Sequence, residues 1–331
     1  MINERLFEQY NIDTKKHLGI INRCPRPFDT ILIDKNGSCY ACECTSWLPQ
    51  SIGNLQIKTL DEIISSPMHK HLQQSIIDKS YRYCNEHQCT YIGKGDVKNI
   101  ALAITNIEHL RLAIDDSCNL RCPSCRSDLI FYKEGSQYNK RIKLANKINT
   151  WLQNITHSCT VHVGSDGDPF ASHVYRYFME HTPSNDQIKY SLLTNGLLIK
   201  EFHNKIPHIL KKLIRLGISI DGATKDTYEK LRLGGSWLKI QENLEFVAEL
   251  KKKYDFEFIL YMVVQQDNWQ EMIDMVELGR QYSADRVIFN KIEDWNTLPN
   301  FKEKIVPEHL EDFQSILKIV KKDPIATTWE M

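Results

Sequence analysis

Three cysteines in one short stretch are the residues of this sequence whose types and spacing best suit chemistry. Cys118, Cys122 and Cys125 form a C-x-x-x-C-x-x-C motif directly after the apolar run at residues 110–114. Three thiolates on one loop can bind three irons of a [4Fe-4S] cluster, which leaves the fourth iron open to another ligand. A zinc knuckle or three unrelated thiols are the alternatives, but structural zinc requires four protein ligands and none follows Cys125 closely. The motif therefore predicts a cluster with one open iron.

A second group of cysteines precedes this motif. Nine of the ten cysteines lie between Cys24 and Cys125, and in a reducing compartment such clustering indicates metal ligation rather than disulfides. A small two-stranded scaffold could bring four of these thiols around a second metal centre: Cys24, Cys42, Cys84 and Cys89. Cys39 or Cys44 could replace the second of them. Zinc stays an alternative to iron here, because both metals accept tetrahedral thiolates and His87 could also ligate.

Charge and hydropathy exclude several classes of partner. Lys+Arg and Asp+Glu are equal at 42 each, so no global field would recruit nucleic acid or an anionic membrane. Residues 1–10 place Glu4, Arg5 and Glu8 among isolated apolar residues, unlike a secretory signal. No run approaches the roughly 18 apolar residues that span a bilayer. We therefore expect a cytoplasmic protein that acts on a small or neutral substrate, without nucleic-acid or membrane partners.

The elements that must position these residues alternate between strand and helix after about residue 106. Apolar runs rich in β-branched or aromatic residues predict strands at 110–114, 160–163, 189–193, 217–220, 256–264 and 286–289. Helical periodicity predicts helices at 140–155, 173–180, 197–215, 237–253, 269–282 and 307–322. Six strand-helix repeats predict a parallel sheet, closed or partly closed as a barrel, with active residues at the carboxyl ends of its strands. Before residue 106, we expect a hairpin around residues 34–37 and helices at 60–66 and 68–77.

Polar residues follow the second, third and fourth of these strands. The loops carry Asp166-Gly167-Asp168, then Thr194-Asn195-Gly196, then Ser219 and Asp221. Each is also compatible with an ordinary turn or helix cap. Because all fall at strand carboxyl ends, on the rim that bears the cysteine motif, we expect the loops to converge on one ligand. Arg232 could bind a carboxylate with its bidentate fork, although a surface arginine is the plainer interpretation.

Taken together, these motifs resemble the radical S-adenosylmethionine (SAM) superfamily. The resemblance covers most of residues 106–295 and includes the cysteine motif, the 166–169 and 194–196 loops, and the stretch 217–224 followed by Tyr228 and Arg232. The region before it is similar to a SPASM or shorter twitch domain, which carries auxiliary clusters. Its matching features are Cys24-Pro25, the turn from Asp34 to Gly37, Cys42 five residues later, Ile52-Gly53-Asn54, a helix and a late cysteine pair.

The resemblance implies an α/β fold, a partial (β/α)6 TIM-like barrel with a small N-terminal SPASM/twitch-like domain. We expect the auxiliary domain at residues 1–105, the barrel at 106–295 and a C-terminal helical extension at 296–331. Here the auxiliary domain precedes the barrel, whereas in most relatives it follows. The usual Gly-Gly-Glu loop is Asp166-Gly167-Asp168, and Ser124 stands where an aromatic residue is common.

The resemblance also implies the roles of individual residues. Cys118, Cys122 and Cys125 would hold the SAM-binding [4Fe-4S] cluster, and the auxiliary [4Fe-4S] cluster would have Cys24, Cys42, Cys84 and Cys89 as ligands. The SAM contacts would be Asp166, Gly167 and Asp168 at the ammonium, Ser219 and Arg232 at the carboxylate, and Asn195 near the ribose. Reductive cleavage of SAM would give a 5′-deoxyadenosyl radical that abstracts hydrogen from a substrate. The implied partners are SAM and an electron donor such as flavodoxin or ferredoxin.

Three functions remain open at this point. The first is oxidation of a small molecule, with the auxiliary cluster accepting the electron. The second is maturation of a ribosomally made peptide. The short stretch before Cys24 counts modestly against it, because no separate peptide-binding domain is visible there. The third is a non-catalytic binding module whose zinc or clusters only stabilise the fold.

Overall fold

The computed structural model describes residues 24–85, 89, 106–294, 298 and 300–329. The chain divides into two compact units. The first comprises Met1–Asp115, Glu134–Asp166 and His181–Lys189, and the second comprises Asp116–Lys133, Gly167–Glu180 and Tyr190–Met331. No helix in the described part of the chain is long and apolar enough to cross a membrane.

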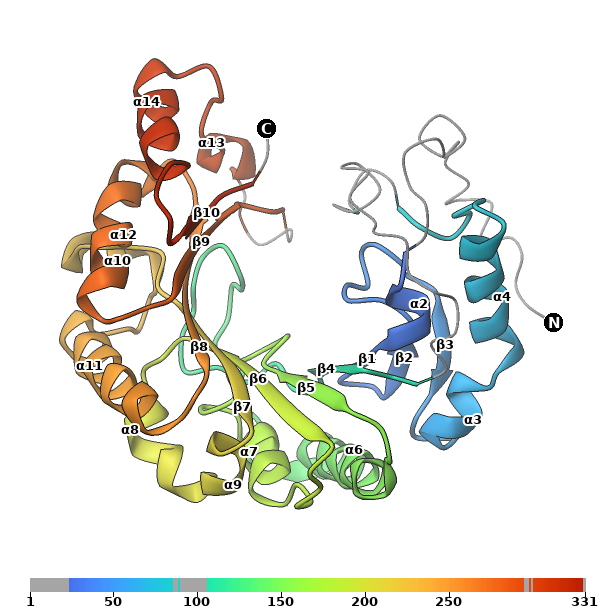
Figure 1. Cartoon of the computed structure of the whole chain (residues 1–331). Helices are drawn as coiled ribbons and strands as arrows, with labels where there is room; N and C mark the ends of the chain where they lie inside the picture. The colour runs from blue at the N-terminus through green and yellow to red at the C-terminus, as the bar shows by residue number, and fades with distance from the viewer. Residues whose placement is uncertain (1–23, 86–88, 90–105, 295–297, 299, 330–331) are drawn as a thin grey trace. The chain divides into compact units, whose positions relative to one another are not determined.

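The first unit is built on a mixed sheet (Figure 1). Its strands are β1 (Thr30–Asp34), β2 (Ser38–Tyr40), β3 (Ser51–Asn54), β4 (His109–Ala113) and β5 (Cys159–Val163), in the order β3-β2-β1-β4-β5. β1 and β2 pair antiparallel, as do β2 and β3, whereas β1 pairs parallel with β4 and β4 with β5. The N-terminal hairpin therefore continues the sheet from the strand that precedes the cysteine motif.

The predicted hairpin at residues 34–37 is confirmed. Gly37 has a φ of 79°, a conformation that a residue without a Cβ adopts readily. The Asp34 carboxylate accepts hydrogen bonds from the backbone N–H of Asn36 and of Ser38, both at 2.8 Å. The turn thus places β2, and the cysteines that follow it, beside β1.

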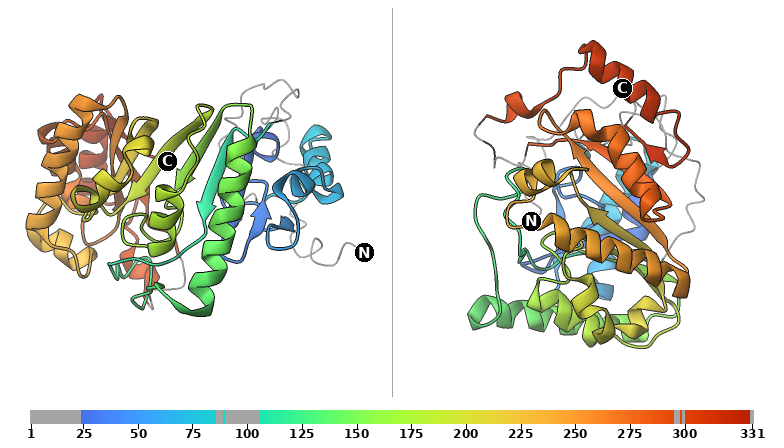
Figure 2. Two further views of the ribbon diagram at one scale, coloured as in Figure 1. Left: turned by 90° about the horizontal axis from the view of Figure 1, so that it is seen from below. Right: turned by 90° about the vertical axis from the view of Figure 1, so that its left-hand side faces the viewer.

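Helices cover this sheet, and all but the short α2 lie where the sequence predicts a helix. They are α2 (Arg26–Asp29), α3 (Leu60–Ile64), α4 (Pro67–Ile77) and α6 (Gly135–Asn154). Thr59 and Glu62 form a capping box at the start of α3, and Ser66 caps α4, whose first residue is Pro67. The long green helix of Figure 2, α6, has a buried face that includes Leu144, Ile148 and Leu152.

The second unit is a parallel sheet with helical crossovers. Its strands are β6 (Ile188–Thr194), which enters the unit at Tyr190, β7 (Leu213–Ser219), β8 (Glu257–Val264), β9 (Arg286–Lys291) and the short β10 (Ala326–Thr327), in that order. Its longer helices are α7 (His173–Glu180), α10 (Lys225–Leu231), α11 (Trp237–Lys253), α12 (Met272–Gln281) and α14 (Glu311–Val320). Strand-helix alternation after residue 106 is thereby confirmed, and all six predicted strands are present in the described residues.

One helix prediction is wrong. The segment 197–215 is not a single helix but α8 (Ile199–Phe202), a 3-10 turn and α9 (Pro207–Leu210), followed by β7. Proline lacks a backbone N–H and disfavours helical geometry in the residue before it, and Ile206 has φ −129° and ψ 44°. The apolar residues from Leu213 onward therefore enter a strand, although their spacing also fits a helix.

Candidate iron-sulfur and SAM site

The cysteine loop is held in place by backbone hydrogen bonds within the second unit. Cys118 N–H donates to the carbonyl of Ile130 at 3.0 Å, and Cys125 N–H donates to that of Cys122 at 3.0 Å. Cys118 and Cys122 are buried, whereas Cys125 is exposed. Cys122 lies near enough to both other thiols for their charges to interact. The structure therefore brings the three predicted ligands together on one loop.

Each of the three sulfurs also accepts a hydrogen bond from a side chain. The pairs are Asn195 Nδ2 to Cys118 at 3.7 Å, Arg232 Nη1 to Cys122 at 3.7 Å and Arg126 Nη2 to Cys125 at 3.6 Å. Cluster-bound thiolates are anionic, and N–H donors to their sulfurs tune the reduction potential. The donor set thus fits an iron-sulfur cluster. Burial raises the pKa of Cys118 to about 11, so this thiol depends on a metal to stay deprotonated at neutral pH.

Arg232 is the most deeply buried cation of the site. Its Nη2 pairs with Asp221 Oδ2 at 2.9 Å. Burial alone would lower the pKa of Arg232, but the Asp221 carboxylate and Cys122 raise it, so the guanidinium stays charged. Its Nε is buried and has no hydrogen-bond partner among the residues described here. The Nε–H is therefore one of the guanidinium donors that makes no hydrogen bond to the described residues.

Asp221 joins the ends of two strands. It has a φ of 64°, a left-handed conformation that aspartate tolerates better than most residues. Its Oδ1 accepts from the N–H of Val263 at 2.8 Å, and its backbone carbonyl accepts from Asn268 Nδ2 at 2.9 Å. Asp221 thereby fixes the end of β7 against that of β8 and orients Arg232 at the same time.

Asp168 is buried and accepts four hydrogen bonds. Its Oδ1 accepts from the backbone N–H of Phe170 at 3.0 Å and of Ala171 at 2.9 Å, and its Oδ2 accepts from the Thr194 hydroxyl and the Asn195 N–H, each at 2.7 Å. Burial raises the pKa of this carboxyl, and these hydrogen bonds act in the opposite direction. The backbone N–H of Asp168 donates to the carbonyl of Ser117 at 2.9 Å. Asp168 therefore ties the loops after β5 and β6 to the cysteine loop.

Replacing Asp168 by asparagine should destabilise the second unit by about 2 kcal/mol. The amide NH2 would face N–H groups that now donate to a carboxylate, and a buried donor without an acceptor costs roughly 1–3 kcal/mol. Loss of the buried charge offsets part of this cost. Denaturant unfolding measures the difference. Asp166→Asn is the matched control, because Asp166 is exposed in the same loop; equal effects of both variants would contradict the role assigned to Asp168.

The other predicted SAM contacts have different surroundings. Gly167 has a φ of 68°. Ser219 ends β7, is half-buried, and its hydroxyl makes no hydrogen bond within the described ranges. The amide of Asn195 is already engaged, since Nδ2 donates to Asn119 Oδ1 at 2.8 Å and Oδ1 accepts from the N–H of Leu197 at 3.1 Å. Sequence reasoning did not anticipate that Asn195 contacts the cysteine loop.

The four cysteines predicted as auxiliary ligands lie together in the first unit. Cys84 interacts electrostatically with Cys24, Cys42 and Cys89, and burial raises the pKa of Cys24 and Cys42 to about 12. Cys39 is buried apart from them. Burial raises the pKa of Cys39, and the charge that raises it further is Asp34 rather than another cysteine. The structure therefore favours Cys42 over Cys39 as the central thiol of this group.

Two ion pairs hold the segments that carry these thiols. Arg26 Nη2 lies 2.6 Å from Glu43 Oε1, which joins the residues just after Cys24 to those just after Cys42. Arg111 of β4 lies 3.7 Å from the same carboxylate oxygen. The cysteine-bearing turns are thus anchored to each other and to the strand that leads to the other cysteine motif.

The arrangement of these side chains bears on which metal they would bind. Among the described residues, no three His, Cys, Asp or Glu side chains surround one point as the ligands of a single ion do. Zinc holds its thiolates at about 2.3 Å, whereas each cysteine of a cubane binds a different iron and the sulfurs stand further apart. His87, the residue that favoured zinc, lies outside the described residues.

Comparison with known proteins identifies the family. Residues 114–279, half of the chain, match the model of the radical SAM superfamily, and residues 24–90 match that of the SPASM iron-sulfur cluster-binding domain. The GTP 3′,8-cyclase of Lactiplantibacillus plantarum is 24% identical over 206 residues, which are 60% of this chain and 58% of that protein. The GTP 3′,8-cyclase of Alkaliphilus metalliredigens is 26% identical over 147 residues, 44% of each chain.

A solved structure to which the chain is similar is that of Streptococcus suis SuiB bound to S-adenosylmethionine. It is 14% identical, with a TM-score of 0.46, over 67% of this chain and 50% of that one. The chain thus spans about half the length of these relatives. Its α/β fold is the partial barrel with an N-terminal SPASM domain that the sequence predicts, and its cofactors are iron-sulfur clusters and SAM. The chain belongs to the radical SAM superfamily of enzymes.

Proposed function

We propose that this enzyme is an oxidoreductase that abstracts hydrogen from a small-molecule substrate and passes an electron to an auxiliary [4Fe-4S] cluster. The observation that carries the proposal is the second group of four cysteines, two buried and two half-buried, in which Cys84 interacts with the other three. Four thiolates fill every iron of a cubane, and a fully ligated cluster has no open iron for substrate. Electron transfer is the role that remains for it.

The same proposal assigns the domains and the first cluster. The auxiliary domain would comprise residues 1–105, the barrel 106–295 and the helical extension 296–331. Cys118, Cys122 and Cys125 would ligate the SAM-binding cluster, supported by the hydrogen bond that each sulfur accepts. Three protein ligands leave one iron open, as the binding of SAM requires.

The SAM contacts divide into direct ligands and positioning residues. The unpartnered Nε of Arg232 and the hydroxyl of Ser219 suit the carboxylate of SAM. Asp166 and Gly167 are proposed at its ammonium group. Asp168 was expected there too, and Asn195 near the ribose, but the polar atoms of both side chains are engaged with the protein. We propose that these two residues act by holding the loops in place.

The chemistry requires a net loss of two electrons from the substrate. Cys118, Cys122 and Cys125 would hold the cluster that, when reduced, supplies the electron for cleavage of SAM to methionine and a 5′-deoxyadenosyl radical. Abstraction of one hydrogen atom by that radical would give 5′-deoxyadenosine and a substrate radical. Cys24, Cys42, Cys84 and Cys89 would hold the cluster that accepts one electron from the substrate radical, while one proton goes to solvent. Flavodoxin or ferredoxin is the class of donor proposed to restore the first cluster. These partners point to a cytoplasmic enzyme.

Maturation of a ribosomally made peptide is the alternative within the same family. It would use the same clusters and differ in what fills the substrate site. Hydrogen abstraction from a peptide transfers label from the peptide into 5′-deoxyadenosine, so the source of that label separates the two functions.

Anaerobic reconstitution tests the proposal directly. Two [4Fe-4S] clusters give about eight irons per chain, and dithionite with SAM should yield 5′-deoxyadenosine. Incubation with extracts of deuterated metabolites should then give deuterated 5′-deoxyadenosine and a product two hydrogens lighter. Tightly bound zinc without SAM cleavage would refute the cluster assignment, and label transfer only from peptides would favour the alternative.

A further inference from the structure

A separate cavity lies within the first unit, at the amino ends of β4 and β5. Its volume is about 340 Å³, within the range of small-ligand sites. The walls come from α3, the last turn of α6 and the residues just before the two strands. The cysteine motif follows the carboxyl end of β4, so the cavity belongs to the opposite end of that strand.

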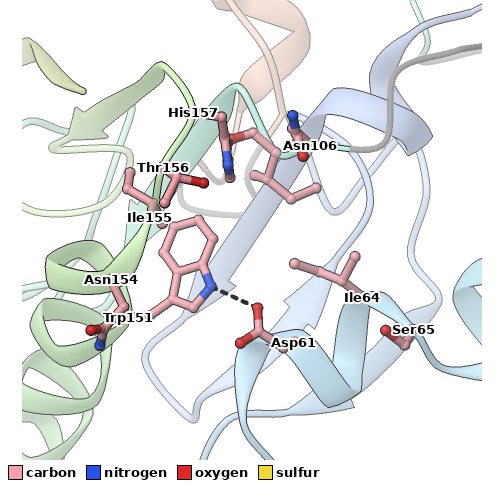
Figure 3. A pocket seen from close by; sticks show the side chains of 10 residues that line it. Asp61, Ile64, Ser65, Asn106, Trp151, Asn154, Ile155, Thr156 and His157 are labelled. Carbon is pink, nitrogen blue, oxygen red and sulfur yellow. Dashed lines mark hydrogen bonds between the residues drawn. The ribbon is translucent and has the colours of Figure 1, made fainter.

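Aromatic and acidic groups face each other across this cavity. The indole N–H of Trp151 donates to Asp61 Oδ1 at 3.0 Å, which fixes both side chains. Figure 3 shows Asp61 and Ser65 on one side of the cavity and Trp151, Thr156 and His157 on the other. The rings of Trp151 and His157 meet edge to face, with centroids 6.3 Å apart. The carboxylate keeps a second oxygen, Oδ2, for a ligand.

The fixed charge at this site is negative, because Asp61 is the one Asp or Glu among the residues that line it. His157 Nε2 lies 3.1 Å from the carbonyl oxygen of Ile107, which can only accept, so this nitrogen carries the proton. In the neutral ring Nδ1 is then an acceptor. The C-terminal end of the 20-residue helix α6 adds partial negative charge beside Trp151, and no Lys or Arg is among the lining residues.

We propose that this cavity binds a small organic cation, an alkylguanidinium or alkylammonium group. The cation would stack on the Trp151 ring and donate to Asp61 Oδ2, while the alkyl chain would lie against Ile64 and Ile155, which also line the cavity. A cation over a tryptophan ring and beside a carboxylate is a favourable arrangement, also where the carboxylate is exposed, as Asp61 is. The inference does not depend on the proposed oxidoreductase activity, because the site lies in neither group of cysteines.

Calorimetric titration of the reconstituted protein with n-butylguanidinium tests the site. The neutral isostere n-butylurea is the ligand control, since it keeps shape and chain but lacks the charge. We expect butylguanidinium to bind at least tenfold more tightly, and its affinity to fall as salt is raised. Equal binding of the two compounds, or binding of neither, would overturn the proposal.

Three variants locate the binding. Asp61→Asn keeps an oxygen to accept from Trp151 but removes the charge, and Trp151→Leu removes the ring; each should weaken butylguanidinium binding about tenfold. Glu249→Gln is the control, because this side chain is exposed in α11. Unchanged affinity in Asp61→Asn, with an unchanged circular dichroism spectrum, would refute the site.

A blocked peptide, acetyl-Gly-Arg-Gly-amide, distinguishes the source of the cation. Binding of this peptide as tight as that of butylguanidinium would indicate an arginine side chain of a polypeptide. Binding of the free cation alone would indicate a small metabolite. Both results support the cation site, and failure of both ligands overturns it.

Discussion

Replacing Cys122 by alanine is expected to abolish the formation of 5′-deoxyadenosine, whereas replacing Cys24 should leave it intact and remove substrate turnover. Cys122 is the thiol that interacts with both Cys118 and Cys125, and two remaining ligands would not hold a cubane with one open iron. Cys24 belongs to the other group, in the first unit. The two variants therefore separate SAM cleavage from disposal of the substrate electron.

Iron content provides an independent measurement. Each variant should retain about four irons per chain, against about eight in the parent protein. Cys159→Ala is the matched control, because Cys159 is buried in β5 and burial is the largest cause that raises its pKa to about 12. It should keep all iron, and so should Cys39→Ala. Formation of 5′-deoxyadenosine by the Cys122 variant would refute the ligand assignment.

Local patterns explain why much of the fold was predictable. α7 and α11 begin and end where the sequence predicts, because their periodicity and flanking residues agree. Cys118, Cys122 and Cys125 are so close in the sequence that they must lie on one loop. Their proximity could therefore be predicted without knowing any contact between distant residues. Where two local signals compete, prediction fails: the apolar spacing up to residue 215 suits a helix, but Pro207 interrupts it and β7 takes the remaining residues.

The features that the sequence did not predict depend on contacts between residues that lie far apart in the chain. β1 pairs parallel with β4, and the residue pattern within either strand does not indicate which strand will lie beside it. The chain also offers many carboxylates, and nothing local shows that Glu271 accepts from the backbone N–H of Ala223, at 2.6 Å, and so holds the start of α10. Asp168 was singled out as a polar residue after a strand, but four donors already surround it. Its position was predictable and its partners were not.

Arg232→Met is expected to destabilise the apo protein by about 3–5 kcal/mol. The variant would leave the Asp221 carboxylate buried without its countercharge, and breaking a buried ion pair from one side costs about this much. It would also remove the donor to Cys122 at 3.7 Å. Guanidinium unfolding followed by circular dichroism gives the free energy. Arg286→Met is the control: its partner Glu257 keeps Arg215, so the loss should stay within about 1 kcal/mol.

A second substitution separates the ion pair from the ligand role of the same side chain. In Asp221→Asn/Arg232→Met no buried charge is left unpaired, so we expect recovery of about half the lost stability. Arg232→Lys keeps the charge, but an ammonium group cannot reach Asp221 and Cys122 together as the forked guanidinium does. The stability of this variant should therefore lie between those of the parent protein and of Arg232→Met. SAM binding should not recover in the double variant, since the Nε donor stays absent. If SAM binding recovered along with stability, Arg232 would act only by orienting the β7 end, and the SAM carboxylate would need another partner.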